Sequence, residues 1–147
     1  MRNGEFGSGS SEFGSRNRRP TGTATNRLES IVMSKDDLKD RTKKFALRII
    51  KLVSSLPNTL EARLIGRELL KSGTSVGANY REATRSRSKA EFRAKIGIVE
   101  QEADETLYWL ELLEESGIVE EKDIRDLIVE SDELVAIFTS IGKSSKK

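Results

Sequence analysis

The sequence contains no cysteine and no histidine among its 147 residues, and it has only two prolines. Without cysteine and histidine the chain can form no disulfide, no thiolate nucleophile, no imidazole base and none of the common zinc sites. Its longest apolar runs, such as "YWLELL", fall far short of the ~20 residues that cross a bilayer, so we expect no membrane partner. The absence of cysteine suits a reducing compartment. We therefore expect a cytoplasmic protein that uses no metal ion or other cofactor.

The first 32 residues have the composition of a linker. They repeat "EFGS" and are rich in glycine and serine, which is typical of a leader added for cloning. We expect residues 1–32 to be such a disordered leader, Met33 to be the natural start, and residues 33–147 to form a single domain. The leader holds five of the 26 basic and three of the 24 acidic residues, which leaves 21 of each and no net charge in the domain.

The charges of the remaining chain are segregated along its length. Positions 39–51 carry six basic residues against one acidic residue, and positions 81–95 carry six against two. Positions 100–133 carry fourteen acidic residues against two basic ones. A chain that is neutral in sum but polarised in sequence predicts separate basic and acidic surfaces.

Apolar residues recur at helical spacing, and the two-residue alternation of strands is absent. Four amphipathic segments follow one another, at about 38–56, 58–80, 89–116 and 120–141. Asn58 and Ser88 each precede a glutamate by three residues, a capping-box spacing that marks the starts of the second and third helices. Pro57 and Gly117 end the first and third helices. Short connections between long amphipathic helices predict an all-α, antiparallel up-down four-helix bundle.

The stretch "SGTSVGAN" has the composition of a glycine-rich phosphate loop. Such a loop needs a preceding buried strand and a lysine beside Ser or Thr after the last glycine, and the sequence has neither. Gly66, Gly73 and Gly77 instead recur along one edge of a helix. Each glycine inside a helix costs ~1 kcal/mol relative to alanine, so we predict that a neighbouring helix packs closely against this edge. Asn79 belongs to the same packing motif, where it either bonds to a neighbouring backbone or faces water.

A second apolar strip lies on the third helix. Ile98, Trp109 and Leu112 project roughly 80–140° from the centre of the main stripe, beyond the ~100° arc that one core needs. The strip is either a broad core beneath neighbouring helices or the interface of a homo-oligomer. These three residues are our interface candidates.

The segment "LLKSGTSVGANYREATRSRSKAEF", followed by "ETLYWLELLEESG", resembles the signature of the 23S rRNA intervening-sequence proteins. The likeness lies in the "SxGAN" helix, the "RxxSxxEF" start of the next helix and the "YWL" near its end, and it covers about positions 38–141. The resemblance implies a small cytoplasmic bacterial protein, built as a homopentameric ring of four-helix subunits, with no agreed catalytic residues. A related group, the accessory proteins of diversity-generating retroelements, binds a reverse transcriptase and nucleic acid through a basic surface.

Two non-catalytic functions fit these observations. The first is binding of RNA or DNA by a basic surface. Few aromatic residues accompany its charges, so binding would be directed at the backbone and sensitive to salt. The second is a structural or protein-interaction scaffold, in which the basic side of one subunit meets the acidic side of the next identical subunit. The candidate nucleic-acid-binding residues are Arg81, Arg85, Arg87, Lys89, Arg93, Lys43, Lys44 and Arg48.

A third hypothesis is a magnesium-dependent nucleotide hydrolase. Glu102 and Glu105 form one ExxE pair, and Glu130 and Glu133 form another, similar to the carboxylate sets of all-α nucleotide pyrophosphohydrolases. Helical projection places Glu130 and Glu133 away from the buried face of their helix. We therefore expect these glutamates to be solvated, and the protein to have no metal site and no enzymatic activity.

Overall fold

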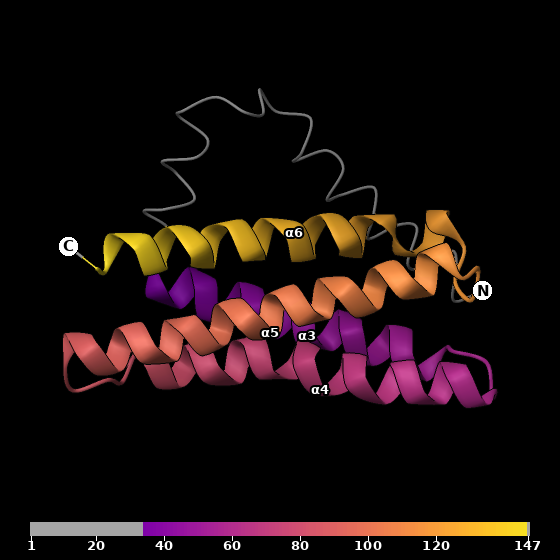
Figure 1. Cartoon of the computed structure of the whole chain (residues 1–147), viewed down its shortest axis with the longest axis horizontal. Helices are drawn as coiled ribbons and strands as arrows, with labels where there is room; N and C mark the ends of the chain where they lie inside the picture. Colours follow the sequence, from indigo (N-terminus) through magenta and orange to yellow (C-terminus); the bar gives the residue numbers. More distant parts are fainter. Residues whose placement is uncertain (1–33, 147) are drawn as a thin grey trace, which may run out of the picture.

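The computed structural model describes residues 34–146, which form four α-helices and no strand. The helices are α3 (Lys35–Ser54), α4 (Leu60–Ala83), α5 (Lys89–Glu115) and α6 (Glu121–Ser144). Each helix runs back along the one before it, with connections at alternate ends of the molecule (Figure 1). This confirms the predicted all-α four-helix bundle, whereas the expectations for the leader and for Met33 fall outside the described residues. None of the described helices has the apolar length that a membrane span requires.

Side-chain caps explain where the helices begin. As predicted, the Ser88 hydroxyl accepts a hydrogen bond from the Glu91 amide, at 3.1 Å, and α5 starts at the next residue. The predicted cap of α4 is wrong by one residue, because Thr59 and not Asn58 accepts from the amide three residues on, at 3.2 Å. Both are good cap formers, and the side chain of Asn58 bonds instead to an arginine further along. Gly117, with φ of 81°, follows the end of α5 as predicted.

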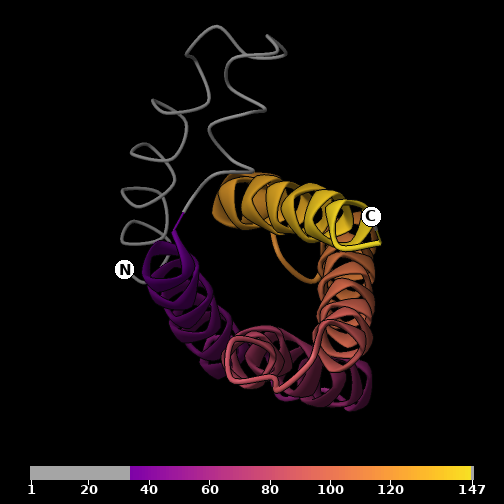
Figure 2. The same cartoon turned by 90° about the vertical axis from the view of Figure 1, so that its left-hand side faces the viewer.

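The core lies along the axis that the four helices surround (Figure 2). Each helix contributes one apolar stripe to it, as the spacing of the sequence predicts. The extent of packing differs between pairs of helices. Helix α4 packs extensively on α3 and α5, and α5 packs extensively on α6, whereas α3 and α6 share few contacts. The core residues that are at most 1% exposed include Phe45, Ile49, Leu69, Val76, Ile96, Leu110, Leu134 and Phe138.

The glycines of α4 lie against α3. A Cβ atom added at Gly73 would lie 2.9 Å from two side-chain carbons of Ile49, and one added at Gly77 would lie 3.1 Å from the hydroxyl of Thr42. A Cβ at Gly66 would also meet a side chain of the α3 region, at 3.0 Å. These separations are shorter than ordinary van der Waals contacts. The predicted close approach of a neighbouring helix is therefore confirmed, and α3 is that helix.

Candidate nucleic-acid interface at the basic end

One end of the bundle brings together three segments that are far apart in the sequence. The start of α3, the α4–α5 connection and the end of α6 meet there (Figure 1). Eight exposed cations lie on these segments, against four carboxylates, so this end carries an excess of positive charge. We call it the basic end and define it by Lys35, Arg81, Arg85, Arg87, Lys89, Arg93, Lys143 and Lys146.

Most cations at the α4–α5 connection have no partner among the described residues. Within residues 34–146, the side chains of Arg81, Arg85, Arg87 and Lys89 form no ion pair and no hydrogen bond. Arg93 only donates to a backbone carbonyl of the α6 end, at 3.3 Å. Their charge is therefore available to an external anion.

The other three predicted nucleic-acid contacts lie farther along α3. Lys43 is eight residues from the helix start, which places it about 12 Å along the axis from the basic end. Lys44 forms an ion pair with Asp40 one turn earlier, at 3.0 Å. Arg48 is half-buried near Asp126 of α6, where burial raises the pKa of that carboxyl and Arg48 opposes the rise. The structure therefore separates these residues from the basic end, and their role in binding stays a prediction.

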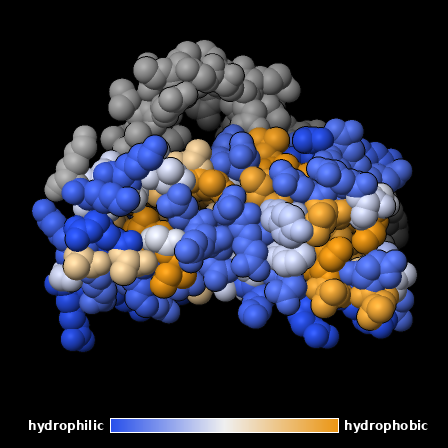
Figure 3. All heavy atoms as spheres, in the orientation of Figure 1, coloured by the Kyte–Doolittle hydropathy of each residue, from blue (hydrophilic) through white to orange (hydrophobic). Residues whose placement is uncertain are grey.

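The predicted interface residues form part of a longer apolar strip. Ile98 is 38% exposed, while Trp109 and Leu112 are half-buried. Two leucines of α4 that the sequence reasoning missed, Leu60 and Leu64, are 73% and 56% exposed. Apolar side chains gather where the start of α4 lies beside the end of α5 (Figure 3). We call these five residues the outer strip. The exposure of the two leucines could have been predicted from the sequence, because they lie opposite the buried stripe of their own helix.

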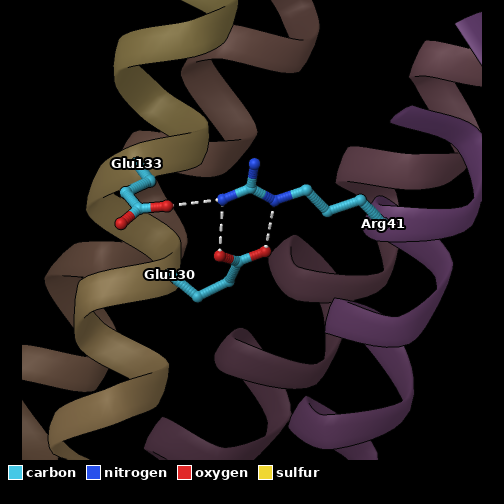
Figure 4. A network of polar contacts seen from close by, with 3 residues as sticks. All are labelled: Arg41, Glu130 and Glu133. Carbon is cyan, nitrogen blue, oxygen red and sulfur yellow. Dashed lines mark hydrogen bonds and ion pairs between the residues drawn. The ribbon is translucent and has the colours of Figure 1, made fainter. Parts of the chain in front are cut away.

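The prediction that Glu130 is solvated is wrong. Its side chain is only 2% exposed, and both carboxylate oxygens accept hydrogen bonds from Arg41 of α3, each at 2.7 Å (Figure 4). Glu133 binds the same guanidinium at 2.6 Å and stays 42% exposed. Burial by itself lowers the pKa of Arg41, but the two carboxylates outweigh it and the net effect raises the pKa. This cluster therefore joins α3 to α6 as a charged, structural contact.

The carboxylate pairs do not assemble a metal site. Glu102 is half-buried, and burial raises its pKa, with Glu105 adding to the rise and Lys71 opposing it. Glu130 is already occupied by Arg41. In the part of the chain that the structure describes, no group of three potential ligands is placed to hold a metal ion. The geometry thus gives no support to the hydrolase hypothesis.

The side chain of Asn79 forms its hydrogen bond within α4 and not with the backbone of a neighbouring helix. Its amide nitrogen donates to the carbonyl of Ser75 one turn earlier, at 2.8 Å. The Ser75 hydroxyl in turn donates to the carbonyl of Lys71, at 2.6 Å. Both polar side chains beside the glycine edge therefore satisfy their hydrogen bonds within the same helix.

Comparisons with known proteins agree with the helical architecture. Residues 35–140, which span α3, α4, α5 and most of α6, match the family described as 23S rRNA-intervening sequence protein. A crystal structure from Bacteroides thetaiotaomicron VPI-5482, described as a protein of unknown function from the S23 ribosomal protein family, is 37% identical. The match covers 76% of this chain and 99% of that chain, with a TM-score of 0.70. No curated protein matches this chain. The chain belongs to the 23S rRNA-intervening sequence protein family.

Proposed function

We propose that this protein is a non-catalytic cytoplasmic subunit that binds the phosphate backbone of RNA or DNA through the basic end. The observation that carries the proposal is the set of arginines and a lysine at the α4–α5 connection that have no partner within the described residues. Each such cation adds to affinity by releasing a counterion from the nucleic acid. The basic end has few aromatic side chains, so it would bind many sequences with similar affinity.

We further propose that the subunits assemble into a closed ring, with the five copies that the family resemblance implies. A ring with more than two subunits needs two different surfaces on each subunit. The outer strip offers one, and exposed apolar residues of α3 and α4 offer a second: Leu47 is 57%, Ile50 43% and Leu70 37% exposed. A ring would also present several basic ends to one nucleic acid and so raise its avidity.

Reversing two charges at the basic end tests nucleic-acid binding. We expect the double variant Arg85→Glu, Arg87→Glu to weaken binding of a labelled RNA by at least about a hundredfold at low salt, because two phosphate contacts become repulsive. Fluorescence anisotropy at several salt concentrations measures the loss, and circular dichroism should show an unchanged fold.

The matched control is Arg63→Glu, Arg67→Glu, which makes the same chemical change and alters the net charge equally but lies on α4 outside the basic end. Its loss should be much smaller. Equal losses in the two double variants would mean that only net charge matters, and would contradict a binding site at the basic end. If the wild-type protein binds neither RNA nor DNA, the alternative hypothesis is favoured, in which the protein is a scaffold that binds only protein.

A charge in the outer strip tests assembly. We expect Ile98→Glu to reduce the assembly to smaller species, because a carboxylate would be buried in an apolar contact without a partner. Light scattering after size-exclusion chromatography gives the mass in solution. Ala136→Glu on the exposed face of α6 is the control and should leave the mass unchanged. An unaltered mass for Ile98→Glu would exclude the outer strip as the interface.

A further inference from the structure

A hollow of about 530 Å³ opens at the basic end. Its lining comes from the start of α3, the α4–α5 connection and the end of α6. The charged residues that line it are Lys35, Arg87 and Lys89, and none of the carboxylates in the described part of the chain lines it. The other lining residues are mostly hydroxyl-bearing: Thr84, Ser86, Ser88, Ser144 and Ser145. This combination of cations and hydroxyl donors suits an oxyanion with several acceptor oxygens.

The hollow also meets the amino end of α5, a helix of 27 residues. The Ser88 hydroxyl already caps the amide of Glu91. The amides of Lys89 and Ala90, in the first turn, have no acceptor within residues 34–146. Free amides and the helix dipole both favour an anion at this position.

A buried hydroxyl beside the hollow is available to a ligand. The oxygen of Ser86 is buried and has no hydrogen-bond partner in the described structure. Buried polar atoms are almost always satisfied, and leaving one unpaired is unfavourable. The residue as a whole is half-buried and lines the hollow, so rotation about its single side-chain torsion can turn the hydroxyl toward a bound group.

We propose that this hollow binds the terminal phosphate monoester of a nucleic-acid strand. In this arrangement Lys35, Arg87 and Lys89 neutralise the phosphate, Ser86 donates a hydrogen bond to it, and the free amides of α5 complete the site. A monoester carries a charge of about −1.5 to −2 and three strong acceptor oxygens, so it can use more of these donors than an internal diester can. The inference rests on the proposed function, because the cations outside the hollow, such as Arg81 and Arg85, would hold the adjoining strand.

The direct test compares short RNAs that differ only at their ends. One carries a 5′-phosphate, one a 3′-phosphate, and one has hydroxyls at both ends. At equal salt, we expect at least one phosphorylated strand to bind about tenfold more tightly than the hydroxyl-ended strand, as one additional charge-assisted hydrogen bond would give. Equal affinities for all three would overturn the inference and leave the proposed function standing. Binding of none of them would instead contradict the proposed function.

Two variants then locate the preference in the hollow. Ser86→Ala and Lys89→Gln should reduce the affinity ratio between phosphorylated and hydroxyl-ended strands to within about threefold. The controls Ser54→Ala on α3 and Lys122→Gln on α6 make the same chemical changes elsewhere and should keep the full ratio. Ser86→Ala should also melt no lower than the wild type, because it removes an unpaired hydroxyl. A full ratio in Ser86→Ala and Lys89→Gln would exclude the hollow as the site.

A competition experiment separates the end of a strand from a free nucleotide. A nucleoside monophosphate offers the same monoester but no neighbouring diesters, so it should displace the phosphorylated RNA only at much higher concentration. If the nucleotide competes as well as the phosphorylated strand does, the hollow serves a free ligand and the assignment to strand ends is wrong.

Discussion

Replacing Glu130 by glutamine is expected to lower the free energy of unfolding by about 2–3 kcal/mol. The Glu130 side chain is 2% exposed, so the change leaves the Arg41 guanidinium facing a buried neutral group. Loss of one partner from a fully buried ion pair costs about 3–5 kcal/mol, and the 21% exposure of Arg41 reduces the expected figure. Urea unfolding followed by circular dichroism measures the difference.

Glu133→Gln is the matched control for this prediction. It makes the same chemical change on the same partner, but the Glu133 side chain is 42% exposed. Ion pairs that water can reach contribute about 0–1 kcal/mol. Similar losses in the Glu130 and Glu133 variants would contradict the view that the buried carboxylate holds α3 to α6.

Replacing Gly73 by leucine is expected to destabilise the protein by about 3 kcal/mol or more. Even a single Cβ atom would come within 2.9 Å of two carbons of Ile49, which is fully buried. Overpacking of this kind typically costs about 1–3 kcal/mol, and leucine adds three further carbon atoms. The melting temperature and the urea midpoint should both fall.

The same substitution at Gly97 of α5 provides the control. A Cβ atom there would meet nothing within 4 Å. We therefore expect Gly97→Leu to be neutral or to stabilise the fold by up to about 1 kcal/mol through improved helix propensity. If Gly73→Leu has the same melting temperature as Gly97→Leu and the wild type, then glycine is not needed at position 73 for the close packing of α3 on α4.

The features that the sequence predicted correctly are those set by short-range spacing. Apolar residues three and four apart define each helical stripe, and Ser88 with Glu91 marks the start of α5. The glycine edge could also be predicted, because three glycines on one helix face are unfavourable unless a neighbour approaches closely. Only the identity of that neighbour, α3, required the structure.

The contact between α3 and α6 could not be predicted in the same way. Arg41 and Glu130 are 89 residues apart, and projection of α6 alone indicates only that Glu130 lies outside the apolar stripe. Which side chains flank a stripe depends on how the first and last helices of the bundle face each other. A basic α3 and an acidic α6 were visible in the sequence and could have suggested the pairing.

The basic end was predicted in part. The Arg81 to Arg93 cluster is contiguous in the sequence, whereas Lys35, Lys143 and Lys146 join it from the two ends of the described chain. An up-down bundle with an even number of helices places its first and last residues at the same end, so the predicted topology contained this information. The hollow itself depends on three segments and on side-chain packing, and no sequence pattern specifies it.

Native mass spectrometry of protein purified without nuclease tests nucleic-acid binding and ring assembly in one experiment, because it measures subunit number and bound nucleic acid together. We expect a ring of five subunits that carries nucleic acid and releases it after a high-salt wash. A monomer that carries no nucleic acid before the wash would contradict both the basic-end interface and the assembly through the outer strip.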